Sequence, residues 1–560
     1  MTTNVFSVLN TAKVGLLAQQ LAIEVTGQNI ANVQTEGYSR QEINFEAKNP
    51  RNTSLGQIGT GVRVVGIKRA HDKFLFSQIL GEGDALGKFS VRKDVFEQLE
   101  VLFSESNGQS LNQSLGKFFS SIHDLSSNPM GLPERSNLVA EAQNLSATFN
   151  NIGESLFQIQ KNLDSTIKVE TTKINSFISE IAELNQAIHA NEPSSFSAND
   201  LRDRRDQRIK ELSELIDLNV VDEMNGQISL TLKNGTPLVL QSKASTLSTQ
   251  INGNNKGFQD ILVSSFEGSS TNVTGVITGG AFKGLIEMRD KEIPAIKDKL
   301  DRLAAGFIQE FNNIHQQGFA LDGTTGNNFF EPPSVITETN TNNTGTATIT
   351  ATNGNPSATS NDKFEITITS EGTFALKNLT TGAASGTFSF TAGSTFNIEG
   401  GFGISISSGA IAGDKFQISV SENAAQTFSV SSSIISNPNK IAAGLNSNTD
   451  GENALSLLGL QSRTSFNSVT HVAEGSGAFT FNEFYNSIVS DLGVQSFSTQ
   501  ATLEQQEGIL LQLNTRRESK SGVSIDEEFI NMVKFQQAYN ASARLIGVVD
   551  ELLDAVISQV

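Results

Sequence analysis

The chain contains no cysteine and no tryptophan among its 560 residues. The absence of cysteine excludes disulfide bonds, thiolate catalysis and cysteine-ligated zinc. If such a chain works outside the cell, large cores or its neighbours in an assembly must hold it together. Lysine and arginine number 40 against 59 aspartates and glutamates, so the net charge is −19. This acidic balance argues against nucleic-acid binding and against binding to an anionic membrane surface.

Export and membrane signals are also missing from the N-terminal region. The first ten residues, MTTNVFSVLN, hold no Lys or Arg, and no long apolar core follows them. This is not a signal peptide of the general secretory type. No window approaches about 18 uninterrupted apolar residues, so we expect no membrane span. These features alone predict a cytoplasmic protein, and export would require a different route.

No pattern of catalytic or metal-ligating residues stands out. The segment NSNTDGENALSL resembles a calcium loop at Asn448, Asp450 and Gly451, but the acidic residue at its twelfth position is missing, so it is interpreted as a turn. The histidines are scattered, with no two at ligand spacing, and are expected to be packed or surface imidazoles: His71, His123, His189, His315 and His471. We therefore predict neither an enzyme nor a bound cofactor or metal.

A heptad repeat occupies the C-terminal end of the chain. Ser524 and the acidic residues Asp526 and Glu527 mark the start of a helix. Its apolar residues then recur at gaps of three, four or seven: Ile525, Phe529, Met532, Tyr539, Ala543, Ile546, Leu553, Ile557 and Val560. Such a repeat keeps one apolar stripe facing a partner helix. At about 50 Å, the helix is too long to be buried by one small domain.

The N-terminal end offers a matching helix, so we expect the two ends to pair and the middle to be an outgrowth. An exposed seam on that pair would also associate with copies of the chain. The predicted assembly interface comprises Val5, Leu9, Ala12, Leu16, Ile23, Ile30, Phe529, Met532, Tyr539, Ile546, Leu553 and Ile557.

The pattern between the two ends predicts a multidomain α+β fold with paired terminal heptad helices, a helical-bundle rod and inserted β domains. The longest helical pattern runs from Ser136 to Ile188. Near-copies DKFEITI, from Asp362, and DKFQISV, from Asp414, indicate equivalent strands of one β domain. The expected domains are 1–70 with 521–560 as a terminal coiled-coil assembly domain; 71–219 with 279–330 and 438–520 as a helical rod; 220–278 as a β domain; and 331–437 as an inserted Thr/Ser/Gly-rich β domain.

The densest charge in the chain lies between Asp200 and Arg208, where acidic and basic residues are interspersed. Such a run is typical of a solvated helix face stabilised by ion pairs three and four residues apart. The alternative is a surface that grips an acidic partner.

The segment GQNIANVQTEGYSRQ, at residues 27–41, resembles the signature of the bacterial flagellar rod, hook and junction proteins. The resemblance is carried by Asn29, Ile30, Ala31, Asn32, Thr35, Gly37 and Tyr38. The terminal segment SIDEEFINMVKFQQAYNASARLIGVVDELLD is similar to the family's C-terminal segment, with matching positions at Gln536, Tyr539, Ala541 and Ala543. The Gly-Tyr-Ser-Arg-Gln form is similar to that of the family's hook–filament junction members.

The resemblance implies a structural axial protein that is exported unfolded through the flagellar type III channel. It implies polymerisation at the hook tip, in the extracellular flagellum, where the protein joins hook to filament. The implied partners are copies of itself in a helical homo-oligomer, the hook protein, a second junction protein, flagellin and an export chaperone. Two alternatives stay open, namely another axial subunit of the hook or filament, and a secreted surface adhesin whose β modules bind a ligand.

Overall fold

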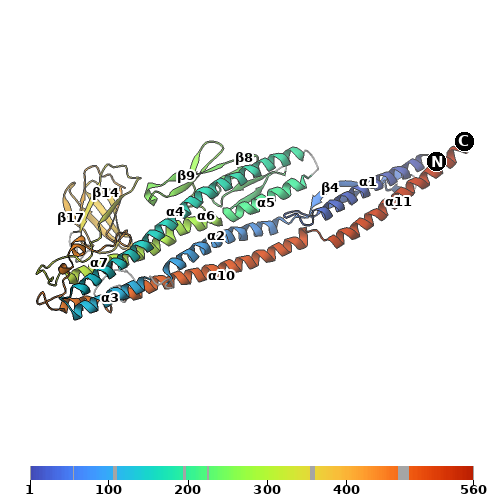
Figure 1. The fold of residues 1–560 in the computed structure, drawn as a ribbon. Coiled ribbons are helices and arrows are strands. Elements are labelled where there is room, and N and C mark those ends of the chain that lie inside the picture. The colour runs from blue at the N-terminus through green and yellow to red at the C-terminus, as the bar shows by residue number, and fades with distance from the viewer. Residues whose placement is uncertain are drawn as a thin grey trace.

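The computed structural model describes residues 2–53, 56–104, 110–192, 197–223, 226–353, 360–464 and 479–558. The molecule is elongated, narrow at one end and broader at the other (Figure 1). The narrow end consists mainly of the two terminal helices, α1 (Thr2–Ala31) and α11 (Ile525–Ile557), which lie side by side with both chain ends at the tip. The predicted pairing of the terminal helices is therefore confirmed.

A β-hairpin packs on α1 where the narrow end meets the rod. Its strands β1 (Gln41–Ala47) and β4 (Val62–Arg69) are antiparallel, and the short strands β2 (Arg51–Thr53) and β3 (Gly56–Ile58) form its tip. The alternating residues of INFEA and GVRVVGIKRA predict β1 and β4.

Long helices build the rod. The helix α4 (Leu132–Asn191) has 60 residues and is about 90 Å long. Helix α10 (Phe481–Ser521) runs beside α2 (Lys73–Phe103) and leads through a short break into α11. The remaining rod helices are α3 (Leu111–Ser127), α5 (Asn199–Leu215), α6 (Gly280–Glu287) and α7 (Ile293–His315), with a π-helical turn at Met288–Glu292 between the last two.

Phenylalanine dominates the core at the broad end of the rod. The Phe118 ring on α3 lies 5.8 Å from the Phe307 ring and 5.4 Å from the Phe311 ring on α7. The Phe149 ring on α4 stacks on Phe428 at 4.7 Å. The short helices α8 (Ser432–Ser436) and α9 (Glu452–Gly459) and the turn Pro438–Lys440 close this end. Residues 424–434 thus belong to the rod core rather than to the β region that precedes them.

An inner β region packs along α4 and shares the core of the rod. One sheet has the order β5 (Asn219–Asp222), β6 (Ile228–Thr231), β7 (Pro237–Leu240) and β8 (Lys243–Ala244). The other consists of β9 (Thr246–Ile251), β10 (Gln259–Ser264) and β11 (Ser270–Asn272). A turn at Asn234 and Gly235, a residue pair typical of β-hairpins, joins β6 to β7, and its glycine has φ +89°.

An outer β region has a hydrophobic core of its own. Its five-stranded sheet has the order β12 (Ile336–Thr339), β19 (Lys415–Ser419), β14 (Phe364–Ser370), β15 (Thr373–Asn378) and β16 (Ala384–Ser389). Its second sheet is β13 (Ile349–Asn353), β18 (Phe402–Ile406) and β17 (Thr395–Asn397). The two near-copies found in the sequence form neighbouring antiparallel strands, with Phe364 opposite Ile418.

These elements make a mixed α+β fold, as the sequence predicts. The division into four domains with the boundaries given above stays a prediction. None of the helices in the described part of the chain has an apolar stretch that could span a membrane.

Candidate assembly interface

Asn29, near the end of α1, connects three parts of the terminal region. Its Nδ2 atom donates to the carbonyl of Gln41 at 3.0 Å and to the carboxylate of Glu528 on α11 at 3.1 Å. Its Oδ1 atom accepts from the Gln41 amide at 2.9 Å and from the Tyr38 hydroxyl at 3.0 Å. The side-chain amide therefore uses both donors and both acceptors inside the protein. A buried polar group satisfied in this way specifies a single arrangement of its neighbours.

The loop after Asn29 is held by the other polar residues of the family motif. The Thr35 hydroxyl donates to Asn32 Oδ1 at 3.1 Å, and Asn32 Nδ2 donates to the carbonyl of Gln28 at 3.0 Å. Gly37 has φ +82°, a conformation that L side chains rarely adopt, and a Cβ atom there would lie 3.2 Å from Gln207 Oε1 on α5. The glycine thus lets the loop turn close to the rod.

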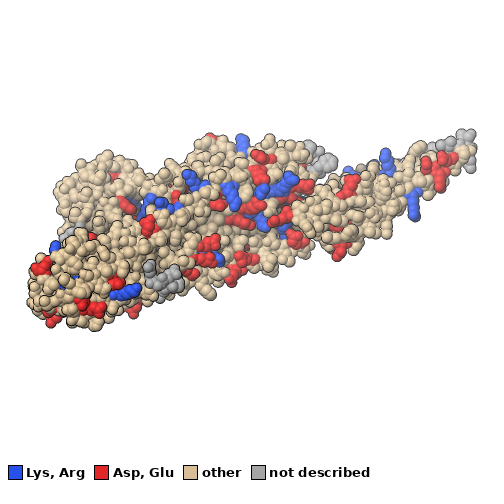
Figure 2. All heavy atoms as spheres, in the orientation of Figure 1, with Lys and Arg blue, Asp and Glu red and all other residues tan. Residues whose placement is uncertain are grey.

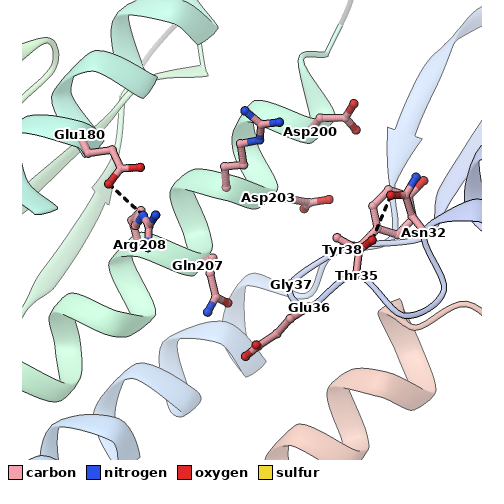
Figure 3. A pocket seen from close by; sticks show the side chains of 11 residues that line it. Asn32, Thr35, Glu36, Gly37, Tyr38, Glu180, Asp200, Asp203, Gln207 and Arg208 are labelled. Atoms are coloured by element: carbon pink, nitrogen blue, oxygen red, sulfur yellow. Dashed lines mark hydrogen bonds and ion pairs between the residues drawn. The ribbon is translucent and has the colours of Figure 1, made fainter.

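The same loop ties the terminal helix pair to α5 (Figure 3). The amide of Ser39 donates to Asp203 at 3.0 Å, and Gln41 Nε2 donates to Asp200 at 2.8 Å. Arg69 on β4 lies 2.7 Å from Asp203 and from Asp206. Burial raises the pKa of Asp203, while the Arg69 guanidinium and the Ser39 amide oppose this rise. Burial, and then the negative charge of Asp200, raise the pKa of the Tyr38 hydroxyl, so it stays a proton donor.

These contacts correct the expectation that residues 200–208 form a solvated face. Asp203 is 7% exposed and Arg205 is 3% exposed. Arg205 donates to Asn185 Oδ1 at 2.9 Å and to the carbonyl of Gly226 at 2.8 Å, and Arg202 pairs with Glu192 at 2.7 Å. The charges are buried because the motif loop, β4 and α4 pack around α5, which sequence spacing alone does not reveal.

A hollow of about 490 Å³ remains between the motif loop and α5. Asn32, Thr35 and Tyr38 approach it from the loop, and Gln207 and Arg208 approach it from α5 (Figure 3). Arg208 pairs with Glu180 at 2.9 Å across one side. Over the described ranges, no group of three or more His, Asp or Glu residues is placed to hold a metal ion.

The two terminal helices pack antiparallel through a seam of small residues on α1. A Cβ atom on Gly15 would lie 3.4 Å from Ser542 Oγ. The Asn29–Glu528 bond lies fourteen residues after Gly15 on α1 and fourteen residues before Ser542 on α11. This register sets the buried Ala18 and Ala22 opposite Tyr539 and Phe535. Small residues facing large ones allow knobs-into-holes packing at close helix separation.

The structure places the residues of the predicted interface at different depths. Ala12 is buried, and Phe529 is 52% exposed. Half-buried positions are Val5, Leu9, Leu16, Ile23, Ile30, Met532, Tyr539, Ile546 and Leu553. The side chain of Ile557 lies outside the described residues. In the remaining motif positions, Asn32, Gly37 and Tyr38 are half-buried, and Ala31, Thr35, Gln536 and Ala541 are exposed.

The seam within the chain differs by one residue from the heptad expected for α11. Phe535, Ser542 and Val549 occupy it where the pattern of apolar residues predicts Gln536, Ala543 and Asp550. Positions 532, 539, 546 and 553 belong both to the observed seam and to the heptad expected from the sequence. The difference arises because α1 also packs against β1 and β4, and its small residues turn toward α11.

A second apolar stripe runs along the outside of α11. Its members are spaced by three, four or eight residues and share one face of the helix, and the exposed polar Gln537 lies in the eight-residue gap. Ile530, Val533, Leu545, Val548 and Leu552 are exposed large apolar residues, and the motif residue Ala541 lies in the same stripe. On α1, Phe6 and Leu17 are also exposed. Uncharged residues make up most of the narrow end in the view of Figure 2. Such an extended apolar stripe on a narrow helical pair is typical of an interaction surface.

The other candidates from the sequence are structural. The carboxylate of Asp450 accepts the backbone amides of Leu445, Asn446 and Glu452, at 2.8 to 3.1 Å, which confirms a turn there. His315 is buried, and its two ring nitrogens bond to the backbone of Asn327 and Ala442. His123 and His189 are exposed, His71 is half-buried 3.3 Å from Asp206, and His471 lies outside the described residues.

Comparisons with known proteins agree with this geometry. Residues 9–38 match the model of the flagella basal body rod protein family, and residues 517–559 match the flagellar basal body rod FlgEFG protein C-terminal family. These two segments contain most of α1, the motif loop and all of α11. Residues 96–330 match the flagellar hook-associated protein FlgK helical domain.

Full-length relatives are similar along the whole chain. Flagellar hook-associated protein 1 of Bacillus subtilis (strain 168) is 26% identical over 596 residues, which cover 99% of this chain and 98% of the relative. The protein of the same name from Salmonella typhimurium (strain LT2) is 28% identical over 567 residues, covering 99% of both chains. The fold is similar to the structure of the flagellar hook junction protein FlgK from Burkholderia pseudomallei, with a TM-score of 0.69 and 20% identity over 79% of this chain and 100% of that chain.

The paired terminal helices and the motif loop that joins them to the rod define a structural, non-enzymatic component of the bacterial flagellum. The chain belongs to the flagellar hook-associated protein 1 family, whose place is the hook–filament junction.

Proposed function

We propose that the terminal helix pair is the assembly unit of this junction protein and that the outer stripe of α11 packs against neighbouring subunits. The observation that carries this proposal is the exposure of Ile530, Val533, Val548 and Leu552 on a helix whose opposite face is already paired with α1. Fully burying one such side chain is worth about 1.5–3 kcal/mol, and the gain recurs in every subunit.

The neighbours along the axis are copies of the same chain. Ala541 supports this proposal because a small residue inside an apolar stripe lets a second helix approach closely. Copies that pack head to tail around an axis form a ring or an open helix rather than a closed dimer. The predicted interface residues on the seam, such as Met532 and Ile546, then support assembly by holding α11 against α1.

The proposed partners beyond the chain itself are the hook protein on one side and a second junction protein and flagellin on the other. An export chaperone is proposed because an apolar stripe of this kind must be shielded before assembly. The division into a terminal assembly domain, a rod and two β domains fits this role, since the broad end carries the parts that do not belong to the terminal pair (Figure 1).

An in-frame deletion combined with point variants tests the proposal. Cells lacking the protein should make finished hooks, carry no attached filaments and release monomeric flagellin into the medium. Ile546→Asp and Leu553→Asp should be secreted but not incorporated, because each places a charge at a half-buried apolar position. Glu551→Lys, at an exposed position, is the matched control and should assemble far better. Normal incorporation of both aspartate variants would contradict the proposal.

A further inference from the structure

The outer β region is attached to the rod by two short segments that lie side by side. One, at residues 331–335, leads into β12, and the other, at residues 420–423, follows β19. The strands are antiparallel, with Ile336 opposite Ser419, so the two segments enter the outer region together. The outer core and the rod core are separate clusters of buried residues. Such an attachment allows the outer region to pivot unless other contacts fix it.

The contacts around this attachment are polar. Asn254, in the loop after β9, accepts the amide of Thr341 at 2.6 Å. Arg302 on α7 donates to the Thr380 hydroxyl at 2.7 Å, and Gln309 on α7 accepts from Asn361 at 3.2 Å. Polar interfaces between domains are characteristic of domains that can move relative to one another.

Glu422 stands at the centre of these contacts. Its carboxylate pairs with Lys256, from the loop after β9 in the inner β region, and with Lys363, just before β14 in the outer β region, at 3.1 Å. Burial acts to raise the pKa of Glu422, but Lys363 and Lys256 outweigh it and hold the pKa at about 2. One mostly buried carboxylate thus links two β regions that belong to different sheets and different cores.

Asp301 on α7 fixes the backbone next to Glu422. One of its oxygens accepts the amide of Asn423 at 3.1 Å and the ammonium of Lys297 at 2.6 Å, and the other accepts the amide of Ala425 at 2.9 Å. Lys297 also donates to Asn423 Oδ1 at 2.7 Å. Asn423 has φ +61°, a conformation that non-glycine residues adopt only when their surroundings hold it. The pivot is therefore anchored to the rod independently of the Glu422 ion pairs.

We propose that Glu422 is a latch that holds the outer β region in one orientation against the rod and the inner β region. The hinge comprises residues 331–335 and 420–423. Because Asp301 anchors the far side of this hinge, loss of the Glu422 pairs releases the outer region without unfolding the rod.

Distance measurements between two spin labels test the latch directly. The chain has no cysteine, so cysteines introduced at the exposed Ser394 in the outer region and Asn162 on α4 are the only labelling sites. The latched protein should give one narrow distance distribution in a double electron–electron resonance experiment. Glu422→Gln and Lys363→Met should each at least double the width of that distribution, because each removes the ion pair that reaches the outer region. Glu371→Gln, an exposed change on the outer region, is the control and should leave it narrow.

Circular dichroism and the thermal transition of the rod show whether each variant is folded. Lys363→Met changes the outer β region rather than the hinge, so it decides the question even if Glu422→Gln fails to fold. A narrow, unshifted distribution in a folded Lys363→Met or Glu422→Gln variant would overturn the latch. A broad distribution in the unsubstituted chain would overturn it as well.

Discussion

The side-chain amide of Asn29 donates a 3.1 Å hydrogen bond to the carboxylate of Glu528, 499 residues further along the chain. Asn29 is 1% exposed and Glu528 is 3% exposed. A carboxylate removed from water is tolerated only when its oxygens are bonded. This contact therefore fixes the position at which the two ends of the chain meet, next to the loop that joins them to the rod.

Replacing Asn29 with alanine should loosen the terminal helix pair. The change leaves the Glu528 carboxylate, the Tyr38 hydroxyl and the Gln41 backbone without their Asn29 partner, at a cost of about 3 kcal/mol. Hydrogen exchange in the monomer should become at least tenfold faster in α1 and α11 and stay unchanged in α4. Gln28→Ala, at an exposed neighbouring position, is the control. Equal protection in Asn29→Ala and the unsubstituted protein would show that the bond does not hold the pair.

The register of the seam predicts different effects at two adjacent positions on α11. Phe535 is half-buried opposite Ala22, whereas Gln536 is exposed. Phe535→Ala should destabilise the helix pair by about 2 kcal/mol, because it removes a large apolar side chain from a close helix contact. Gln536→Ala should change the stability by less than about 0.5 kcal/mol. The rate of limited proteolysis in the terminal segments of each variant measures both changes in stability. Equal sensitivity at the two positions would favour the heptad expected from the sequence.

The pairing of the two terminal helices could be predicted because a heptad repeat depends only on the spacing of apolar residues within each segment, and this spacing is visible in the sequence. The position of the seam could not, because α1 has two partners and the sequence does not say which face meets which. The family motif singles out Tyr38 and Asn29, but the bond between them and the bonds of Asn29 to Gln41 and Glu528 depend on how the loop folds. The sequence does not reveal that Asp203 and Arg205 are buried, because alternating charges on a helix normally face solvent. Glu422 and Lys256 gave no signal, since 166 residues separate the two ends of that ion pair.

The buried His315 should make the rod less stable as the pH falls. Burial lowers the pKa of this imidazole from 6.5 to about 4, so between these values the unfolded chain binds a proton that the folded chain does not. This histidine therefore does not reduce the free energy of unfolding above about pH 6.5. Below that value the free energy of unfolding falls, and it continues to fall until the pH approaches 4. Between about pH 7.5 and pH 5 the loss should be about 2 kcal/mol. Urea unfolding at both values measures it. His315→Gln should remove this part of the pH dependence, and His123→Gln, at an exposed position, should keep it.

The outer β region should be dispensable for joining hook to filament, provided that it is removed at the right positions. A deletion of 331–437 would remove residues of the rod core, including Ile434 and Phe428, whose ring lies 4.9 Å from the ring of Phe330. Since Ile336 lies opposite Ser419, a short Gly/Ser bridge can replace 336–419, with Val335 and Val420 changed to threonine. The shortened protein should support nearly normal motility. Absence of filaments despite normal secretion of this variant would contradict the prediction.

Variants at two adjacent valines on α11 test pairing within the chain and assembly between chains separately. Val549 is 3% exposed and faces α1, whereas Val548 is 53% exposed and lies in the outer stripe. Val549→Asp places a charge in the seam, so the monomer should lose protection from exchange in α1 and α11 before any assembly is attempted. Val548→Asp leaves the seam intact, and the monomer should keep its helicity and its exchange protection.

Val548→Asp should nevertheless be secreted in soluble form and fail to join the hook, because the aspartate would be buried at each contact between subunits. Val548→Leu keeps the position apolar and should assemble. The measurements are hydrogen exchange of the purified monomers, and the amounts of protein in the medium and on isolated hooks. If Val548→Asp assembles as well as Val548→Leu, the outer stripe is not the contact between subunits, and the assembly surface must lie on another part of the molecule.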